Sequence, residues 1–243
     1  MKVKIVETKN LIRTMDMYSN LRAGTDFIPK MSLMHGDSGL GKTTSLTYLT
    51  NQLTASGCQP IFVRCMATDT PSSFVARIMK ELGSEMLYPL RNSVDFIIER
   101  MNELQVPLFI DEADHIVGQL KTMETIRDLY DATEQPVMLV GMEQIAKRIS
   151  HRKQIFNRIS EWVEFQPADL EDVNLFATEL LEGGISVGED LLNDIRVRTG
   201  GEIRRILIAL DKIEQFAMSN DFDYVDKECW GDGPLFLEHG RRR

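Results

Sequence analysis

The sequence predicts an α/β protein in which a parallel sheet is covered by helices and followed by a smaller helical domain. Three observations predict this class: short apolar runs typical of buried strands, helical periodicity between these runs, and no further strand pattern beyond Gln166. Buried strands that alternate with helices favour a parallel sheet with both faces covered. The five expected strands are Met31–His35, Pro60–Cys65, Val106–Asp111, Val137–Gly141 and Glu161–Gln166.

Apolar residues between the later strands recur at the i, i+3, i+4 spacing of a helix. They are Val94, Ile97, Ile98, Met101 and Leu104, and then Met123, Ile126 and Leu129 after Gln119. Beyond the last strand, three helices are expected at Asp169–Glu182, Glu189–Arg198 and Glu202–Met218. We therefore expect a main domain over residues 1–166, with 1–30 as its lead-in, and a helical domain over 167–243 with an acidic tail that ends in Arg241, Arg242 and Arg243.

Composition excludes several classes of protein. The 243 residues carry a formal net charge of −9, which excludes a globally basic nucleic-acid coat, and the 43% hydrophobic content is that of a globular protein with a core. Cys58, Cys65 and Cys229 lack metal-site spacing and are expected to be reduced thiols. The N-terminus lacks a signal-peptide pattern and no apolar run is long enough to span a membrane, so the cytoplasm is the expected location.

A glycine-rich phosphate loop follows the first expected strand. Residues 36–43, GDSGLGKT, match the GxxxxGKT pattern, in which backbone N–H groups converge on phosphate oxygens. Lys42 is expected to bridge the outer phosphates and Thr43 to hold Mg²⁺. The alternative, a glycine turn that happens to contain a lysine, does not explain the order of strand, loop and helix, with the helix expected from Thr44. The expected nucleotide contacts are Gly36, Asp37, Ser38, Gly39, Leu40, Gly41, Lys42, Thr43 and Thr44.

Two carboxylates end the third expected strand and form a Walker B pattern. Asp111 is expected to bind Mg²⁺ through water, and Glu112 to polarise the attacking water in phosphoryl transfer. The alternative is an acidic pair that caps the next helix. The sequence contains no guanine-reading NKxD motif, which favours ATP over GTP. Glu112 and Lys42 are thus the first catalytic candidates.

Residues 147–158 carry five cations and no acid in this acidic chain. Arg158 stands just before the fifth expected strand, where an arginine can stabilise the γ-phosphate of ATP bound to an adjacent subunit, and is the third catalytic candidate. Arg148, Arg152 and Lys153 fit equally well on an ordinary solvated helix.

A second arginine candidate follows the glycine pair at 200 and 201. Arg204 lies in the first turn of a helix, where its charge opposes the helix dipole, and this placement indicates a phosphate partner. Arg205 is the reserve candidate. A neighbouring acidic residue would explain either arginine without a nucleotide.

Together these features resemble the AAA+ ATPases over nearly the whole chain. The runs PLFIDEADHI, METIRDLYDATEQPVMLVGMEQIAKRI and FNRISEWVEFQP are similar to the transposition ATPases typified by the Mu phage B protein, TniB and TnsC. This resemblance implies a P-loop fold with a C-terminal helical lid, ATP and Mg²⁺ as cofactors, and no membrane partner. It also implies an ATP-dependent homo-oligomeric filament on duplex DNA, without sequence preference, that selects target sites and activates a transposase in a bacterial or phage-infected cell.

The resemblance assigns roles to residues that match its motifs. Gly36 and Gly39–Thr43 correspond to the phosphate loop, Asp111 and Glu112 to Walker B, Arg158 to the arginine finger and Arg204 to sensor 2. Sensor 1 departs from the pattern, because Gly141 and Met142 replace the polar residue expected after the fourth strand.

DNA contacts are then expected from the ATPase body, since only about 30 residues precede the first strand and leave no room for the helix-turn-helix domain of the Mu protein. Binding duplex DNA requires cations gathered on one face. The candidates lie in or near the segments after the second and third strands: Arg64, Arg77, Lys80 and Lys121. Each also fits an ordinary surface charge.

Two other functions remain open. The first is an ATP-driven switch that acts on a protein partner in secretion, as in ExeA-like ATPases, or in signalling, without DNA. The second is a small-molecule kinase, which would leave Arg158 and Arg204 without a role.

Overall fold

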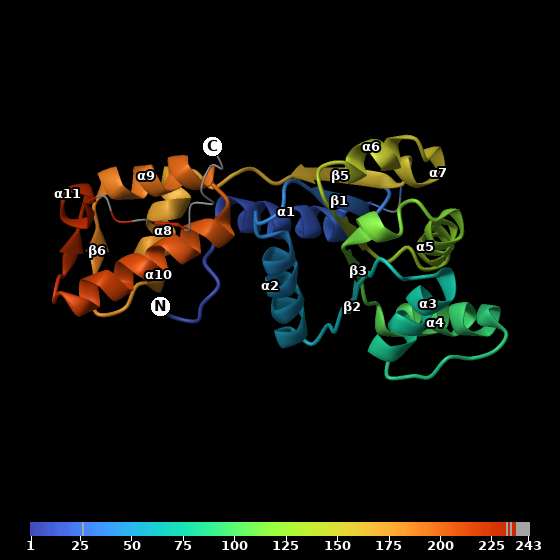
Figure 1. The fold of residues 1–243 in the computed structure, drawn as a ribbon. Coiled ribbons are helices and arrows are strands. Elements are labelled where there is room, and N and C mark those ends of the chain that lie inside the picture. The colour runs from blue at the N-terminus through green and yellow to red at the C-terminus, as the bar shows by residue number, and fades with distance from the viewer. Residues whose placement is uncertain (26, 232, 234, 237–243) are drawn as a thin grey trace. The chain divides into compact units, whose positions relative to one another are not determined.

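A computed structural model describes residues 1–25, 27–231, 233 and 235–236 (Figure 1). The predicted terminal residues Arg241, Arg242 and Arg243 lie outside this part. The chain divides into two compact units. The α/β unit comprises Ile12–Asp37 and Lys42–Phe165, and the helical unit comprises Met1–Leu11, Ser38–Gly41 and the residues from Gln166 onward.

The α/β unit is built on a five-stranded sheet in the order β2-β3-β4-β1-β5, and every neighbouring pair is parallel, as predicted. Because the strands are parallel, their carboxyl ends meet at one edge, which is where ligands bind in such sheets. Gly36 directly follows β1 at this edge, and Asp111 is the last residue of β3. The strands are β1 Met31–His35, β2 Ile61–Arg64, β3 Leu108–Asp111, β4 Val137–Val140 and β5 Ile159–Glu164.

The fifth strand differs from its predicted range of Glu161–Gln166. It begins at Ile159, which is buried and pairs with Met31, and it ends at Glu164. The register with β1 shifts between Met31 and Ser32. The apolar run WVEF marked this strand in the sequence, but its bounds depend on the ladder with β1, which the sequence does not show.

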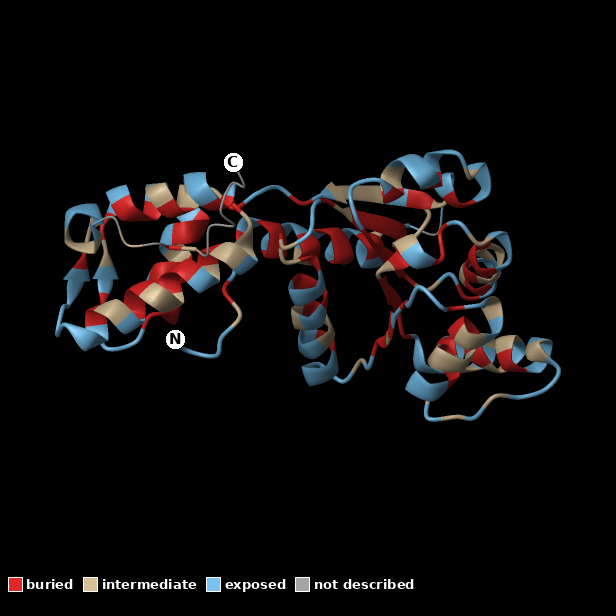
Figure 2. Cartoon of the chain, viewed as in Figure 1, coloured by how far each residue is buried: buried red, intermediate tan, exposed pale blue. Residues whose placement is uncertain are grey.

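Helices connect the strands of this unit and cover both faces of the sheet, as predicted. Phe74 from α3, Ile97 from α4 and Ile126 from α5 are fully buried in one cluster with Ile110 of β3. Buried residues lie along the strands of the sheet and on one side of the helices around it (Figure 2). Phe109, which precedes Ile110 on β3, points to the opposite face of the sheet. There its ring contacts the ring of Tyr18 from α1 edge-on, with 5.8 Å between the ring centroids. The helices are α1 Lys9–Ala23, α2 Lys42–Ala55, α3 Pro71–Glu81, α4 Leu90–Leu104, η1 Ala113–His115, α5 Leu120–Thr133, α6 Ile145–Ser150 and α7 Lys153–Phe156.

Two helix boundaries refine the sequence predictions. Helix α2 begins at Lys42 rather than at Thr44, so Lys42 and Thr43 belong to its first turn. The segment 1–30, expected only as a lead-in, contains the 15-residue helix α1.

The helical unit packs around its own core. Apolar side chains of α10 line it, with Ile206, Leu210 and Ile213 fully buried. The prediction of no strand beyond Gln166 was wrong, because β6 Ser186–Val187 and β7 Tyr224–Val225 form a parallel pair. Two-residue strands are too short to leave an alternating pattern. The helices are α8 Leu170–Leu180, α9 Glu189–Thr199, α10 Ile203–Ser219 and α11 Lys227–Trp230.

No helix in the described part of the chain combines the length and apolarity needed to cross a membrane.

Candidate functional site

The backbone of residues 36–43 bends through conformations that favour glycine. Gly36 and Gly39 have φ values of 147° and 80°. A Cβ atom at Gly36 would lie 2.9 Å from the carbonyl oxygen of Phe165, so a side chain there would collide with the backbone beyond β5. A loop of this shape between a strand and a helix N-terminus suits an anion.

Lys42 holds its ammonium group at this loop. Its Nζ donates hydrogen bonds to the carbonyl oxygens of Gly36 at 2.7 Å and Asp37 at 2.6 Å. Burial lowers the pKa of Lys42, and the negative charges of Glu112 and Asp114 oppose this shift. Both hydrogen-bond acceptors are neutral carbonyls, so the lysine charge remains available to an anionic ligand.

Thr43 and Asp111, the two predicted metal ligands, are in direct contact. Thr43 Oγ1 donates to Asp111 Oδ2 at 2.9 Å. Asp111 is 2% exposed, and this burial raises its pKa. The hydrogen bonds from Thr43 and from the Glu112 N–H group lower the pKa of Asp111 but do not outweigh the burial. Mg²⁺ is usually held by one or two carboxylates together with substrate phosphates and waters. A buried carboxylate beside a hydroxyl, next to a phosphate-loop backbone, therefore fits Mg²⁺.

Glu112 has a strained backbone. Its φ of 55° lies in the left-handed region, which costs a non-glycine residue about 1–2 kcal/mol. Strained residues of this kind cluster at functional sites. The side chain is one-third exposed, and its Oε1 lies 3.3 Å from Nη2 of Arg64. One predicted DNA contact thus lies beside the predicted catalytic carboxylate.

Asp114, which no sequence motif singles out, also belongs to this site. Its Oδ2 accepts a hydrogen bond from the Met142 N–H group at 2.6 Å. A Cβ at Gly141 would lie 2.5 Å from the same oxygen, so the glycine admits the carboxylate. A polar group therefore does lie after β4, but the segment after β3 supplies it. Two features of the sequence could have indicated this contact: the acidic residue two positions beyond Glu112 and the glycine at position 141.

Arg158, the predicted arginine finger, is held within its own chain. Its Nε and Nη2 donate to the two carboxylate oxygens of Asp131, each at 2.6 Å, and Nη1 donates to the carbonyl oxygen of Gln154 at 2.6 Å. The ion pair with Asp131 raises the pKa of Arg158. To contact a neighbouring subunit's nucleotide, Arg158 would have to exchange Asp131 for phosphate.

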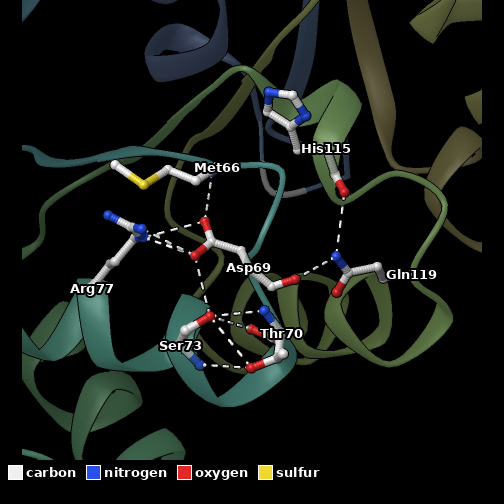
Figure 3. Close-up of polar contacts among 7 residues, drawn as sticks. All are labelled: Met66, Asp69, Thr70, Ser73, Arg77, His115 and Gln119. Carbon is white, nitrogen blue, oxygen red and sulfur yellow. Dashed lines mark hydrogen bonds and ion pairs between the residues drawn. The ribbon is translucent and has the colours of Figure 1, made fainter.

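Arg77, a predicted DNA contact, is engaged by Asp69 (Figure 3). Asp69 is 5% exposed, and its Oδ1 lies 3.1 Å from Nη2 of Arg77. Burial alone would raise the pKa of Asp69, but hydrogen bonds from the Met66 N–H group, Arg77 and Ser73 outweigh it and hold this pKa below its ordinary value. Arg77 therefore fastens the loop between β2 and α3.

The same loop is hydrogen-bonded to the segment that follows Asp111 and Glu112. Gln119 Nε2 donates to the carbonyl oxygen of Asp69 at 2.7 Å and to that of His115 at 3.3 Å (Figure 3). The two remaining predicted DNA contacts, Lys80 on α3 and Lys121 on α5, are exposed.

In the helical unit, the start of α10 adjoins residues 38–41. The Ile203 N–H group donates to the carbonyl oxygen of Gly39 at 3.0 Å, and the Glu202 side chain packs against Gly39. Arg204 is exposed in the next position. Arg205, the reserve candidate, stacks over the ring of Phe236, with 4.9 Å between its guanidinium carbon and the ring centroid.

The AAA domain family matches residues 28–149, about half of the chain. No curated protein matches the sequence. Among solved structures, the fold is similar to that of the Aeropyrum pernix ORC1 protein in complex with DNA, with a TM-score of 0.64, 17% identity and coverage of 94% of this chain and 64% of that one. The chain thus spans less than two thirds of the length of ORC1.

Two further structures show the same fold. The Aeropyrum pernix ORC2 protein, solved as ADPNP and ADP complexes, gives a TM-score of 0.71 at 12% identity, covering 94% of this chain and 68% of that one. Domain III of the Thermotoga maritima replication initiation protein DnaA gives a TM-score of 0.59 at 16% identity, covering 93% of this chain and 91% of that one. At these identities the likeness establishes the fold alone.

Proposed function

Because the chain belongs to the AAA domain family, we propose that it is an Mg²⁺-dependent ATPase that acts on duplex DNA. The observation that carries the ATPase proposal is the contact between Thr43 and Asp111 beside the loop that holds Lys42. It joins a phosphate loop to a buried carboxylate on another strand, as phosphoryl transfer requires.

Each residue of the site then has a distinct task. Lys42 binds the outer phosphates, and Thr43 and Asp111 hold Mg²⁺, which when bound neutralises negative charge on the phosphates. Glu112 accepts a proton from the attacking water or orients it. Arg204 contacts the nucleotide from α10, and Arg158 contacts it from an adjacent subunit.

DNA is proposed as the partner because the fold is similar to that of an ORC1 protein solved with DNA. The exposed cations Arg64, Lys80 and Lys121 are the proposed contacts. The chain's net charge of −9 makes each copy a weak binder, but a filament multiplies weak contacts along the duplex. From the resemblance to transposition ATPases, we further propose that this filament binds without sequence preference, selects target sites and activates a transposase.

One observation favours the second candidate, an ATP-driven switch that acts on a protein without DNA. Arg77 is held by a buried carboxylate and Arg64 pairs with Glu112, so two of the four predicted DNA contacts are already engaged in ion pairs.

Duplex DNA binding by the purified protein with ATP, with ADP and without nucleotide distinguishes the two candidates. Filaments imaged in the same samples report assembly. We expect binding and filaments with ATP only, and loss of both in Lys42→Ala at an ATP concentration just sufficient for the wild type. Intact ATP hydrolysis without DNA binding in any nucleotide state would contradict the DNA proposal and support the protein-directed switch.

A further inference from the structure

A cleft of about 460 Å³ lies in the α/β unit where α5 meets the α6–α7 segment. Leu120, Met123 and Ile155 supply apolar walls, and Arg152 and Lys153 supply positive charge. Met123 and Ile155 are nearly fully buried, whereas Leu120 is 58% exposed. A volume of this size accommodates small organic groups, including amino-acid side chains.

The residues that line this cleft include two cations, Arg152 and Lys153, and one carboxylate, Glu124. The sequence contains no acidic residue from 144 through 160. Arg152 Nη2 donates to the carbonyl oxygen of Gly118 at 2.9 Å, and no ion pair involves Arg152 or Lys153 in the part of the chain that the structure describes. Arg158, only five residues beyond Lys153, is by contrast paired with Asp131.

We propose that this cleft binds an acidic peptide segment of a partner protein, with an apolar side chain between Leu120 and Ile155 and carboxylates at Arg152 and Lys153. Arginine–carboxylate pairs are strong when geometry is good, and an apolar anchor supplies the burial that a surface ion pair lacks. Duplex DNA fits less well, because its phosphate backbone has no apolar group for the walls of the cleft.

The cleft is also connected to the segment after Glu112. The Gly118 carbonyl that Arg152 binds and the Asp114 carbonyl that Arg148 Nη1 contacts at 3.4 Å both belong to this segment. A carboxylate that attracts the Arg152 guanidinium would compete with Gly118 for its donors. If the proposed ATPase activity holds, the bound peptide therefore changes the turnover rate, whereas the binding itself does not depend on that activity.

The test uses the full chain and fluorescence anisotropy with two labelled 12-residue peptides. Each has three glutamates on either side of a central leucine or phenylalanine. Control peptides replace the central residue by alanine or all glutamates by glutamine. The cleft variants are Leu120→Asp and Lys153→Glu, both at exposed positions. Lys147→Glu is the matched control, because Lys147 is exposed on α6 and does not line the cleft.

We expect at least one acidic peptide to bind, with affinity reduced at least tenfold by either cleft variant and by either change in the peptide. Lys147→Glu should leave the affinity within about twofold. Absence of binding by both peptides, or equal binding by the glutamine peptide, would overturn the proposal. It would also fail if a 20-base-pair duplex bound and both Lys147→Glu and Lys153→Glu weakened that binding while the peptides did not bind.

Discussion

Arg64 Nη2 lies 3.3 Å from Glu112 Oε1, and this ion pair follows from the register of two neighbouring strands. Arg64 ends β2 and pairs in register with Asp111, which ends β3. Glu112 is the next residue, so its side chain comes within reach of the guanidinium. The contact holds the Glu112 carboxylate toward Arg64, so the carboxylate must leave the guanidinium to orient the attacking water.

Replacing Arg64 by alanine should therefore raise basal ATP hydrolysis. The pair is largely exposed, and such pairs contribute about 0.2–1 kcal/mol, so we expect an increase of about 1.4- to fivefold. Steady-state phosphate release without DNA is the measurement. Arg64→Lys, which keeps the charge, should remain near the wild-type rate. Unchanged or lower turnover in Arg64→Ala would show that the contact does not restrain Glu112.

The Glu112→Gln variant should separate nucleotide binding from hydrolysis. Glutamine keeps the size of the side chain but cannot accept the proton, and loss of a general base costs about 10²–10⁴-fold in rate. ATP affinity, measured by calorimetry, should stay near that of the wild type, and the ATP-bound oligomer should persist. Persistence of wild-type turnover in this variant would remove Glu112 from the proposed mechanism.

Lys42→Ala, unlike Glu112→Gln, should weaken ATP binding itself. A charge-assisted hydrogen bond contributes about 1.5–3 kcal/mol, which corresponds to roughly ten- to hundredfold in ATP affinity. Folding should be intact, since burial disfavours the charged lysine and the alanine leaves only two carbonyl acceptors without their donor. The ATP affinity of Lys42→Ala is measured by the same calorimetric titration as that of Glu112→Gln. A near-normal affinity would contradict the role assigned to Lys42.

The pair formed by Arg158 and Asp131 tests whether the arginine acts between subunits. Arg158→Ala should leave ATP affinity at low protein concentration near normal and abolish the rise in turnover with concentration. Asp131→Asn keeps the arginine but weakens its ion pair, so it should retain or increase that rise. Both are read from specific activity plotted against protein concentration. Equal loss of ATP affinity and turnover in Arg158→Ala would place its action within its own subunit.

Local spacing was enough to predict the strands β1 and β3 that precede the candidate phosphate loop and end in the candidate metal-binding carboxylate. In each case the chemistry lies in consecutive residues, such as Gly36–Thr43, and apolar runs mark the elements on either side. The sheet class followed from the same runs, because strands buried on both faces are apolar throughout.

Contacts between distant segments could not be predicted in the same way. The pairing of Arg64 with Glu112 depends on β2 lying beside β3, and the contact of Asp114 with Met142 depends on β3 lying beside β4. Strand order is not apparent in chain order. The sequence therefore indicated a missing polar group near Gly141 and could not show that Asp114 supplies one.

Arg77 provides the sharpest distinction between a structural role and DNA binding. Arg77→Ala leaves the buried Asp69 carboxylate without its cation, and a buried hydrogen-bonding group that loses its partner costs about 1–3 kcal/mol. We therefore expect a lower free energy of unfolding in urea and DNA affinity within about twofold of wild type. Lys80→Glu, at an exposed position of the same helix, should show the reverse.

The acid side of the stability profile gives an independent check on the same pair. Because the folded-state pKa of Asp69 is lowered, its ionised form stabilises the protein above the unfolded-state value of about 3.9. This contribution disappears as the pH falls through the lower folded-state pKa. The difference in unfolding free energy between wild type and Asp69→Asn should therefore be largest near neutral pH and shrink below about pH 4. A difference that stays constant from pH 7 to pH 3 would mean that the charge of Asp69 does not hold the loop.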